Sequence, residues 1–239
     1  MARFSGKTIL VTGASGGVGE AMVRRLGEEG ATVCLSSRNR KRLGEIAAGV
    51  GQQRGRIYPA DLTNEGALQE AVQRMLGENE RLDAVVHCAA IIFLDGVATA
   101  SSQDFEKQWQ TNVLGPFRLT QLLLPALISS RGQVIFINSS AGRRAPAGVS
   151  QYAATKHALK AVADSLRDEC NAAGVRVCSL FLGSTATPMQ KAIRSQQKRT
   201  YEPERLIQPS DVAEMVAAVL ALPPTAEVTE LDLRPTDKA

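Results

Sequence analysis

The sequence has few of the residues that build metal centres or disulfide frameworks. Its 239 residues include four cysteines and two histidines. The cysteines do not show the short spacing of metal ligands, and neither histidine lies in a cluster with cysteines or carboxylates. We therefore predict reduced thiols and no metal site.

Long apolar runs and dense basic tracts are also missing. The longest apolar runs, such as Leu122–Ile128, fall far short of the roughly 20 residues of a membrane span. The first seven residues contain no apolar signal core. The net charge is only +4, and no Lys/Arg tract interleaves with aromatic residues. We expect a cytoplasmic protein that binds neither membrane nor nucleic acid.

What the chain does contain is a regular alternation of short apolar, β-rich runs with longer helical patterns. Such strands are typical of a parallel sheet covered on both faces. Without a Pro/Gly/Ser-rich linker or a repeat, the alternation predicts one doubly wound α/β domain over residues 1–239. Strands are expected at Thr8–Val11, Thr32–Ser36, Arg56–Tyr58, Leu82–Cys88, Gln133–Asn138, Arg176–Phe181 and Glu227–Leu233. Helices are expected at Val18–Glu29, Lys41–Val50, Glu65–Asn79, Ser102–Ser129, Ser150–Ala173 and Asp211–Ala221.

The segment 183–209 interrupts this rhythm. It has weak periodicity and several charges, and it follows the carboxyl end of a predicted strand, where open α/β sheets bind ligands. We interpret it as a substrate lid, although a solvated insertion explains the same pattern. Its basic excess is compatible with an acidic substrate and equally with a solvated surface.

A glycine cluster joins the first predicted strand to the first helix. Gly13, Gly17 and Gly19 have the spacing Gly-x3-Gly-x-Gly. Glycine permits a tight turn and lets backbone amides approach a pyrophosphate, while the helix N-terminus adds free N–H groups. The turn therefore predicts a dinucleotide phosphate site, and the alternative is a turn that simply packs closely.

The end of the second strand bears on the choice of dinucleotide. In this kind of fold an acidic residue here holds the ribose 2′-hydroxyl of NAD, whereas an arginine accommodates the 2′-phosphate of NADP. Ser36 and Ser37 stand at the strand end, and Arg38 follows at once. This favours NADP(H) over NAD(H), unless Arg38 merely belongs to the basic start of the next helix.

Tyr152 and Lys156 are four residues apart in a predicted helix, which places them on one face. A nearby ammonium favours the phenolate, so we expect the pKa of Tyr152 to be lowered toward neutrality. Such a tyrosine serves as a general acid or base. The alternative is a surface pair of no chemical consequence.

These features together resemble the classical short-chain dehydrogenase/reductases, and the resemblance covers nearly the whole chain. Five motifs occur in the family's order and spacing: Thr12–Gly19, the pair Asp61–Leu62, Asn112, Ser139 thirteen residues before Tyr152, and Tyr152-x3-Lys156.

The resemblance implies a Rossmann fold and a role for each site residue. Tyr152 would exchange a proton with the substrate oxygen, Ser139 would hydrogen-bond that oxygen, and Lys156 would tune Tyr152 and hold the nicotinamide ribose. Asn112 would position a water that links Lys156 to solvent. The implied cofactor contacts are Gly13, Ser15, Gly16, Gly17, Val18, Gly19, Arg38, Asp61, Leu62, Ala89, Tyr152, Lys156, Thr185 and Thr187.

The sequence departs from the family pattern in two places. After the fourth strand it has His87-Cys88-Ala89-Ala90 where Asn-Asn-Ala-Gly is usual. We expect that change to affect stability more than catalysis. In the later Thr-Pro motif Thr187 is kept, and Thr185 stands where an aliphatic residue often contacts the carboxamide.

The leading interpretation is an NADP(H)-dependent oxidoreductase that acts on a small carbonyl or secondary alcohol substrate, mainly as a reductase. One alternative is a non-catalytic NADP(H)-binding redox sensor, which could dispense with Tyr152 and Lys156. A structural interaction module is another. The resemblance also implies a homodimer or homotetramer formed through helices 102–129 and 150–173.

Overall fold

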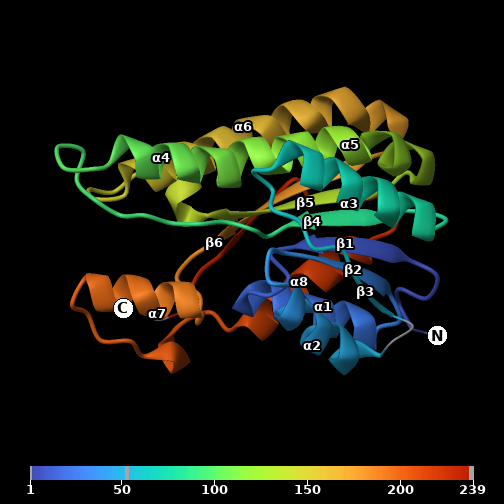
Figure 1. Cartoon of the computed structure of the whole chain (residues 1–239), viewed down its shortest axis with the longest axis horizontal. Helices are drawn as coiled ribbons and strands as arrows, with labels where there is room; N and C mark the ends of the chain where they lie inside the picture. The colour runs from blue at the N-terminus through green and yellow to red at the C-terminus, as the bar shows by residue number, and fades with distance from the viewer. Residues whose placement is uncertain (1, 52–53, 237–239) are drawn as a thin grey trace.

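A parallel sheet forms the centre of the computed structural model, which describes residues 2–51 and 54–236 (Figure 1). Its seven strands lie in the order β3-β2-β1-β4-β5-β6-β7, and every neighbouring pair is parallel. The predicted α/β class is therefore confirmed. The strands are β1 (Thr8–Thr12), β2 (Thr32–Ser36), β3 (Gly55–Ile57), β4 (Ala84–His87), β5 (Gln133–Ser139), β6 (Arg176–Leu182) and β7 (Glu230–Leu233).

Helices cover both faces of the sheet, as Figure 1 shows. On one face lie α3 (Glu65–Glu78), α5 (Gly115–Ser130) and α6 (Ser150–Cys170). On the other face lie α1 (Gly17–Glu28), α2 (Arg40–Val50) and α8 (Pro209–Leu220). Two further helices, α4 (Ser102–Trp109) and α7 (Pro188–Gln196), stand at the end of the molecule where the strands finish.

The central strands are mostly apolar because successive side chains serve two cores. In β5, Val134 and Phe136 pack under α3, α5 and α6, whereas Ile135 and Ile137 pack under α1 and α8. Alternate strand residues point to opposite faces, and both faces are covered. The buried apolar runs that identified the strands in the sequence are therefore a consequence of the double layer.

The structure differs from the sequence-based assignment in three segments. The last strand begins at Glu230 rather than Glu227. The segment 183–209 contains the helix α7, in which Thr187 accepts from the Gln190 amide and Pro188 occupies the first helical position. Ser or Thr before a proline is a helix-start signal that weak apolar periodicity concealed.

The third difference lies in the predicted helix 102–129. The structure divides it into α4 and α5, joined by a π-helical turn over Gln110–Leu114. The whole segment Ser102–Ser130 is long and apolar enough to pass a simple test for a membrane span. In the fold, however, Leu119, Leu123 and Leu127 fill the core under α5, which explains its apolar composition.

The strand order creates the place where a ligand can enter. β1 lies between β2 and β4, and the chain leaves β1 toward one edge of the sheet and later leaves β4 toward the other. The helices that follow these two strands therefore lie on opposite faces, which opens a crevice at the carboxyl ends of the strands. The glycine turn predicted from the sequence lies directly at this switch point.

Candidate active site

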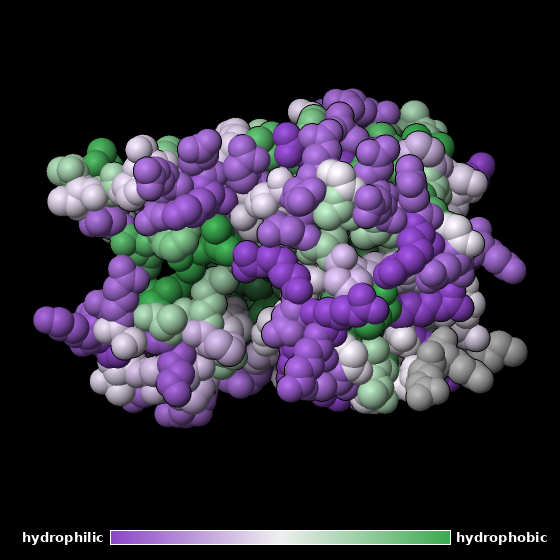
Figure 2. Space-filling view, in the orientation of Figure 1, coloured by the Kyte–Doolittle hydropathy of each residue, from purple (hydrophilic) through white to green (hydrophobic). Residues whose placement is uncertain are grey.

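A cleft of about 730 Å³ opens at the carboxyl ends of the strands. The sequence-predicted site residues come together there from seven separate segments, and all of them line the cleft except Asn112. In Figure 2 the molecule is hollowed at one end, between the part that carries α4 and the part that carries α7.

The glycine turn at β1 requires glycine for steric reasons. Gly13 has φ = +64°, and a Cβ there would lie 2.8 Å from backbone atoms of Ala89. A Cβ on Gly19 would lie 2.2 Å from the carbonyl oxygen of Gly13. No side chain caps the start of α1 at Gly16. The first backbone amides of the helix therefore have no side-chain acceptor where they face the cleft. This is a suitable cradle for a pyrophosphate.

The strand ends next to the turn are held together by Thr12, which the sequence analysis named only as part of the motif. Its hydroxyl oxygen accepts from the amides of Cys88 (3.0 Å) and Ala89 (3.2 Å). The first and fourth strands are thereby joined just beyond the last residue of the β4 ladder. The bonds fix Ala89 against the turn, where the resemblance places a cofactor contact.

Beyond the turn, the cleft reaches polar side chains after β2 and β3. Arg38 is exposed, and the hydroxyl of Ser37 is buried with no hydrogen-bond partner among the described residues. Burial works to raise the pKa of Asp61, but hydrogen bonds from Thr63 and the nearby Arg38 hold it below its ordinary value. A buried hydroxyl beside a guanidinium suits an anionic ligand group.

At the centre of the cleft, Ser139 at the end of β5 and Tyr152 in the first turn of α6 both line the wall, and the Ser139 hydroxyl is near enough to influence the pKa of the Tyr152 phenol. Asn138 fixes both elements: its Nδ2 donates to the Lys156 carbonyl oxygen (3.1 Å), and its Oδ1 accepts from the Ser139 amide (2.8 Å). The neighbouring Gly142 leaves room for this amide, because a Cβ there would lie 2.6 Å from Asn138 Oδ1. These contacts hold the end of β5, with Ser139, against the first turns of α6, with Tyr152 and Lys156.

The ammonium of Lys156 is buried behind the phenol. Its Nζ lies 5.7 Å from the centre of the Tyr152 ring and donates to the carbonyl oxygen of Ile137 at 3.1 Å. Burial lowers the pKa of Lys156 to about 8 and raises the pKa of Tyr152 to about 12, although the nearby Ser139 hydroxyl works to lower the latter. The expected lowering of the Tyr152 pKa is therefore wrong for the protein alone, because desolvation of the phenol outweighs the lowering influence of Ser139.

Asn112 lies behind the cleft wall, in the π-helical turn between α4 and α5. Its Nδ2 donates to the Ile91 carbonyl oxygen (2.9 Å) and to Thr155 Oγ1 (3.2 Å), and its Oδ1 accepts from the Ile91 amide (2.9 Å). Both amide hydrogens are thus used within the protein. The side chain holds the segment after β4 against α6, and π-helical turns are frequent at functional sites.

The residues that depart from the family pattern are accommodated in the sheet. His87 stacks on Phe136 with ring centres 4.8 Å apart, and its Nε2 lies 3.0 Å from Thr120 Oγ1. Burial lowers the pKa of His87 to about 3 and raises the pKa of Cys88 to about 12, so both are neutral at physiological pH. Within the part of the chain that the structure describes, no cluster of His, Cys, Asp or Glu suits a metal ion.

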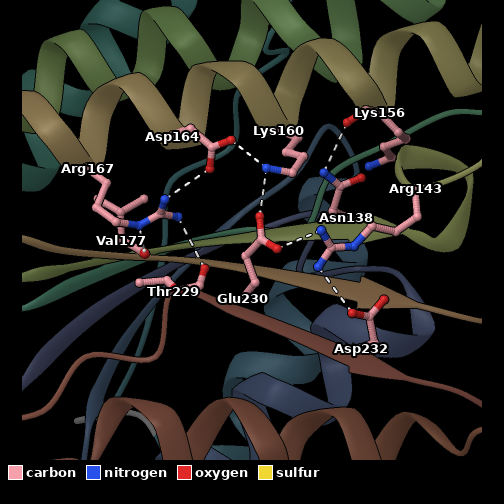
Figure 3. Close-up of polar contacts among 10 residues, drawn as sticks. All are labelled: Asn138, Arg143, Lys156, Lys160, Asp164, Arg167, Val177, Thr229, Glu230 and Asp232. Atoms are coloured by element: carbon pink, nitrogen blue, oxygen red, sulfur yellow. Dashed lines mark hydrogen bonds and ion pairs between the residues drawn. The ribbon is translucent and has the colours of Figure 1, made fainter.

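A network of ion pairs links α6, which carries Tyr152 and Lys156, to β7 and to the segment after Ser139 (Figure 3). Glu230 on β7 bridges Lys160 on α6 (2.7 Å) and Arg143 in the segment after Ser139 (2.6 Å). Arg143 also contacts Asp232 (3.1 Å). Hydrogen bonding to Lys160 lowers the pKa of Glu230. These partly exposed pairs add little stability individually, but together they tie α6, β7 and the segment after Ser139 to one another.

The model of the short-chain dehydrogenase family matches residues 7–198 of this chain, which is most of its length. The chain belongs to the short-chain dehydrogenase family. The family's curated members in Staphylococcus include an uncharacterised oxidoreductase of S. epidermidis, 28% identical over 236 residues that cover 98% of this chain and the whole relative. This short-chain dehydrogenase is accordingly an oxidoreductase.

Solved structures agree with this short-chain dehydrogenase over nearly its whole length. An alcohol dehydrogenase from the archaeon Thermococcus sibiricus, complexed with 5-hydroxy-NADP, is 27% identical, with a TM-score of 0.88 over 96% of this chain and 97% of that one. A short-chain dehydrogenase from Escherichia coli CFT073, complexed with NADPH, is 30% identical, with a TM-score of 0.88 over 97% and 98%.

Two sets of cleft residues in this dehydrogenase escaped the sequence analysis. Asn138 was assigned only to a strand, and its position directly before Ser139 was the available signal. The apolar side chains that complete the cleft come from the segment after β4 and from α7; they are Ile91, Ile92, Met189 and Ile193. The sequence analysis interpreted the segment that contains α7 as a lid, but it did not indicate which side chains of that segment face the cleft.

Proposed function

We propose that this short-chain dehydrogenase reduces an aldehyde or ketone with NADPH, and oxidises the corresponding alcohol in the reverse direction. The observation that carries the proposal is that Ser139, Tyr152 and Lys156 line one cleft, with the Lys156 ammonium 5.7 Å from the centre of the Tyr152 ring. Two hydroxyl donors in the same part of a cleft suit a carbonyl oxygen that gains negative charge.

Each residue has a distinct part in this reaction. When bound, the nicotinamide cofactor supplies or accepts the hydride. Ser139 holds the substrate oxygen, and Tyr152 gives it a proton in reduction or removes one in oxidation. A phenol with a raised pKa keeps its proton at neutral pH, which is the form that reduction needs. Lys156 stabilises the phenolate that remains, because its ammonium faces the ring within the buried wall.

The cleft residues fit an NADP cofactor. The glycine turn leaves space that any Cβ at Gly13 or Gly19 would remove, and the start of α1 offers free amides to the pyrophosphate. Arg38 and the unpartnered hydroxyl of Ser37 suit a ribose 2′-phosphate. Several similar structures were solved with NADP or NADPH, which supports the same preference here.

Replacing the proton donor tests the reaction. Tyr152→Phe should lower kcat/KM for carbonyl reduction on the order of 10³-fold, because general acid catalysis contributes about 10²- to 10⁴-fold. NADPH binding, followed by the fluorescence of the bound cofactor, should stay within about twofold, since the change removes one hydroxyl. The matched control is Tyr201→Phe, which lies outside the cleft lining and should keep full activity.

The same measurement separates this function from its main alternative. If Tyr152→Phe reduced carbonyls as fast as the unaltered protein, the proton-donor role would be wrong. If the unaltered protein bound NADPH but turned over none of a broad panel of aldehydes and ketones, a cofactor-sensing protein would be the better interpretation.

Replacing the guanidinium tests the cofactor preference. Arg38→Asp should weaken NADPH binding on the order of 30-fold, the value of about 2 kcal/mol for a charge-assisted hydrogen bond, while NADH binding changes by less than about threefold. Arg40→Asp, two residues further on the exposed start of α2, is the control. Equal losses for both cofactors, measured by calorimetry, would remove Arg38 from the 2′-phosphate site.

We also propose that the protein is a homodimer or homotetramer that uses the helical segments 102–130 and 150–173. Four large apolar side chains on the first segment are exposed: Phe105, Trp109, Phe117 and Ile128. Burial of such side chains between copies would remove their apolar surface from water. Light scattering that gave a monomer mass at micromolar concentration would refute this arrangement.

A further inference from the structure

The cleft continues past Ser139 and Tyr152 between two apolar walls. Ile91 and Ile92, after β4, line one side, and Met189 and Ile193, on α7, line the other. Figure 2 shows apolar surface gathered inside the hollow between these two parts of the molecule.

These walls lie outward of the cofactor cradle. The start of α7 lies against the glycine turn, because a Cβ on Gly17 would lie 3.3 Å from Thr187. The end of α7 meets the segment after β4, since Gln196 Nε2 donates to the Leu94 carbonyl oxygen at 3.3 Å. Met189 and Ile193 lie between these two contacts, so they face the space that a substrate must occupy next to the cofactor.

Charged groups are absent from this outer part of the cleft, as far as the described residues show. Only three charged residues line the cleft at all: Arg38, Asp61 and Lys156. The first two belong to the far end, after β2 and β3, and they interact electrostatically with one another. Lys156 is buried and donates to the Ile137 carbonyl oxygen.

The basic residues of the segment 183–209 do not supply a charge to the cleft either. Lys191, Lys198 and Arg199 are exposed, and neither they nor Arg194 line it. The basic side chains that the sequence shows in this segment therefore do not face the cleft. It gives no support to an acidic substrate.

We infer that the substrate is an uncharged and largely apolar ketone or aldehyde, whose hydrocarbon part lies between Ile91, Ile92, Met189 and Ile193. The inference rests on the proposed carbonyl reductase function. Apolar surface buried against these walls favours binding. A carboxylate or ammonium placed there would lose its hydration without gaining a partner, which is strongly unfavourable.

A pair of substrates that differ mainly in charge tests this. Ethyl 4-oxopentanoate and 4-oxopentanoate carry the same ketone, and we expect kcat/KM with NADPH to favour the ester on the order of 100-fold. In the neutral series from hexan-2-one to octan-2-one, kcat/KM should rise about fourfold for each added methylene, the effect of burying one such group.

A designed cation should reduce the discrimination against the acid. Met189→Arg places a positive charge in the apolar wall and should raise the acid-to-ester ratio of kcat/KM at least tenfold, on the order expected for a charge-assisted hydrogen bond. Met189→Gln, a polar but uncharged change at the same place, should leave that ratio within about threefold. Gln73→Arg, on the exposed surface of α3, controls for the added net charge.

The outcomes distinguish the inference from the function on which it rests. An acid reduced as fast as its ester, or a Met189→Arg ratio equal to that of Met189→Gln, would overturn the apolar substrate class while leaving carbonyl reduction intact. Binding also reports without turnover: Tyr152→Phe protein loaded with NADPH should bind the ester at least tenfold more tightly than the acid by calorimetry. If the ester bound more tightly but the unaltered protein turned over neither compound, the reductase function alone would be rejected. If the acid bound more tightly, the apolar substrate class would be rejected.

Discussion

Lys156 should lower the stability of the cofactor-free protein at neutral pH. Its side chain is 2% exposed, and burial lowers its pKa from 10.5 to about 8. A tenfold change in proton affinity corresponds to about 1.4 kcal/mol. Burial of the charged ammonium therefore lowers the free energy of unfolding by about 3 kcal/mol. The hydrogen bond of Lys156 to the Ile137 carbonyl oxygen offsets about 1 kcal/mol of this loss in stability.

An apolar side chain of the same length should therefore stabilise the fold while it abolishes catalysis. We expect Lys156→Met to raise the free energy of unfolding by about 2 kcal/mol at pH 7, which corresponds to about 4–8 °C in Tm for a chain of this size. Thermal unfolding followed by circular dichroism or calorimetry measures this. Lys191→Met, a change at an exposed residue of α7, should leave Tm within about 1 °C.

The pH dependence identifies the cause. Because the folded-state pKa of Lys156 lies below its unfolded value, the unfolded chain binds more protons between about pH 8 and 10.5. The unaltered protein therefore gains stability relative to Lys156→Met as the pH rises through that window, and the full cost is present below it. The difference in Tm between Lys156→Met and the unaltered protein should therefore disappear as the pH rises from 8 to 10.5.

Two results would refute this reasoning. A Lys156→Met protein that melts below the unaltered protein at pH 7 would mean that the ammonium contributes more through its contacts than it loses by burial. A Tm difference that stays constant from pH 7 to 10.5 would mean that a charged Lys156 is not the source of the effect.

Substitutions at Gly19 and Asn138, with Gly16→Ala as a control, test how the cleft is built. Gly19→Ala should abolish NADPH binding in a calorimetric titration, since the new Cβ would lie 2.2 Å from the Gly13 carbonyl oxygen; Gly16→Ala, with 3.4 Å to the same atom, should retain it. Asn138→Ala should lower kcat about 10- to 100-fold with an unchanged KM for NADPH, because it frees the backbone of Lys156 without touching the cofactor cradle. An equal loss in kcat and in NADPH affinity would make Asn138 a general structural residue.

Much of the architecture followed from local pattern in the sequence. The alternation of continuous apolar strands with helices predicted the doubly wound parallel sheet, because strands buried on both faces cannot alternate in polarity. The glycine turn was recognisable because only glycine tolerates the backbone conformation and close contacts at Gly13. The family resemblance predicted that Ser139, Tyr152 and Lys156 share one site, and in the structure all three line the same cleft, because β5 and α6 are consecutive elements.

Other features depended on contacts between distant segments, which spacing alone does not carry. The lowered Tyr152 pKa expected from the helical spacing of Lys156 was wrong for the protein alone, because the cost of desolvation is set by everything that packs around the pair. Likewise, the cations of the segment 183–209 are plain in the sequence, but only the folding of α7 decides that Met189 and Ile193 face the cleft and the cations do not. The sequence by itself determined the fold and the choice of the proposed reacting groups through local pattern. The tertiary structure decided their protonation and the apolar character of the cleft, because burial and the direction of side chains arise only when the segments pack together.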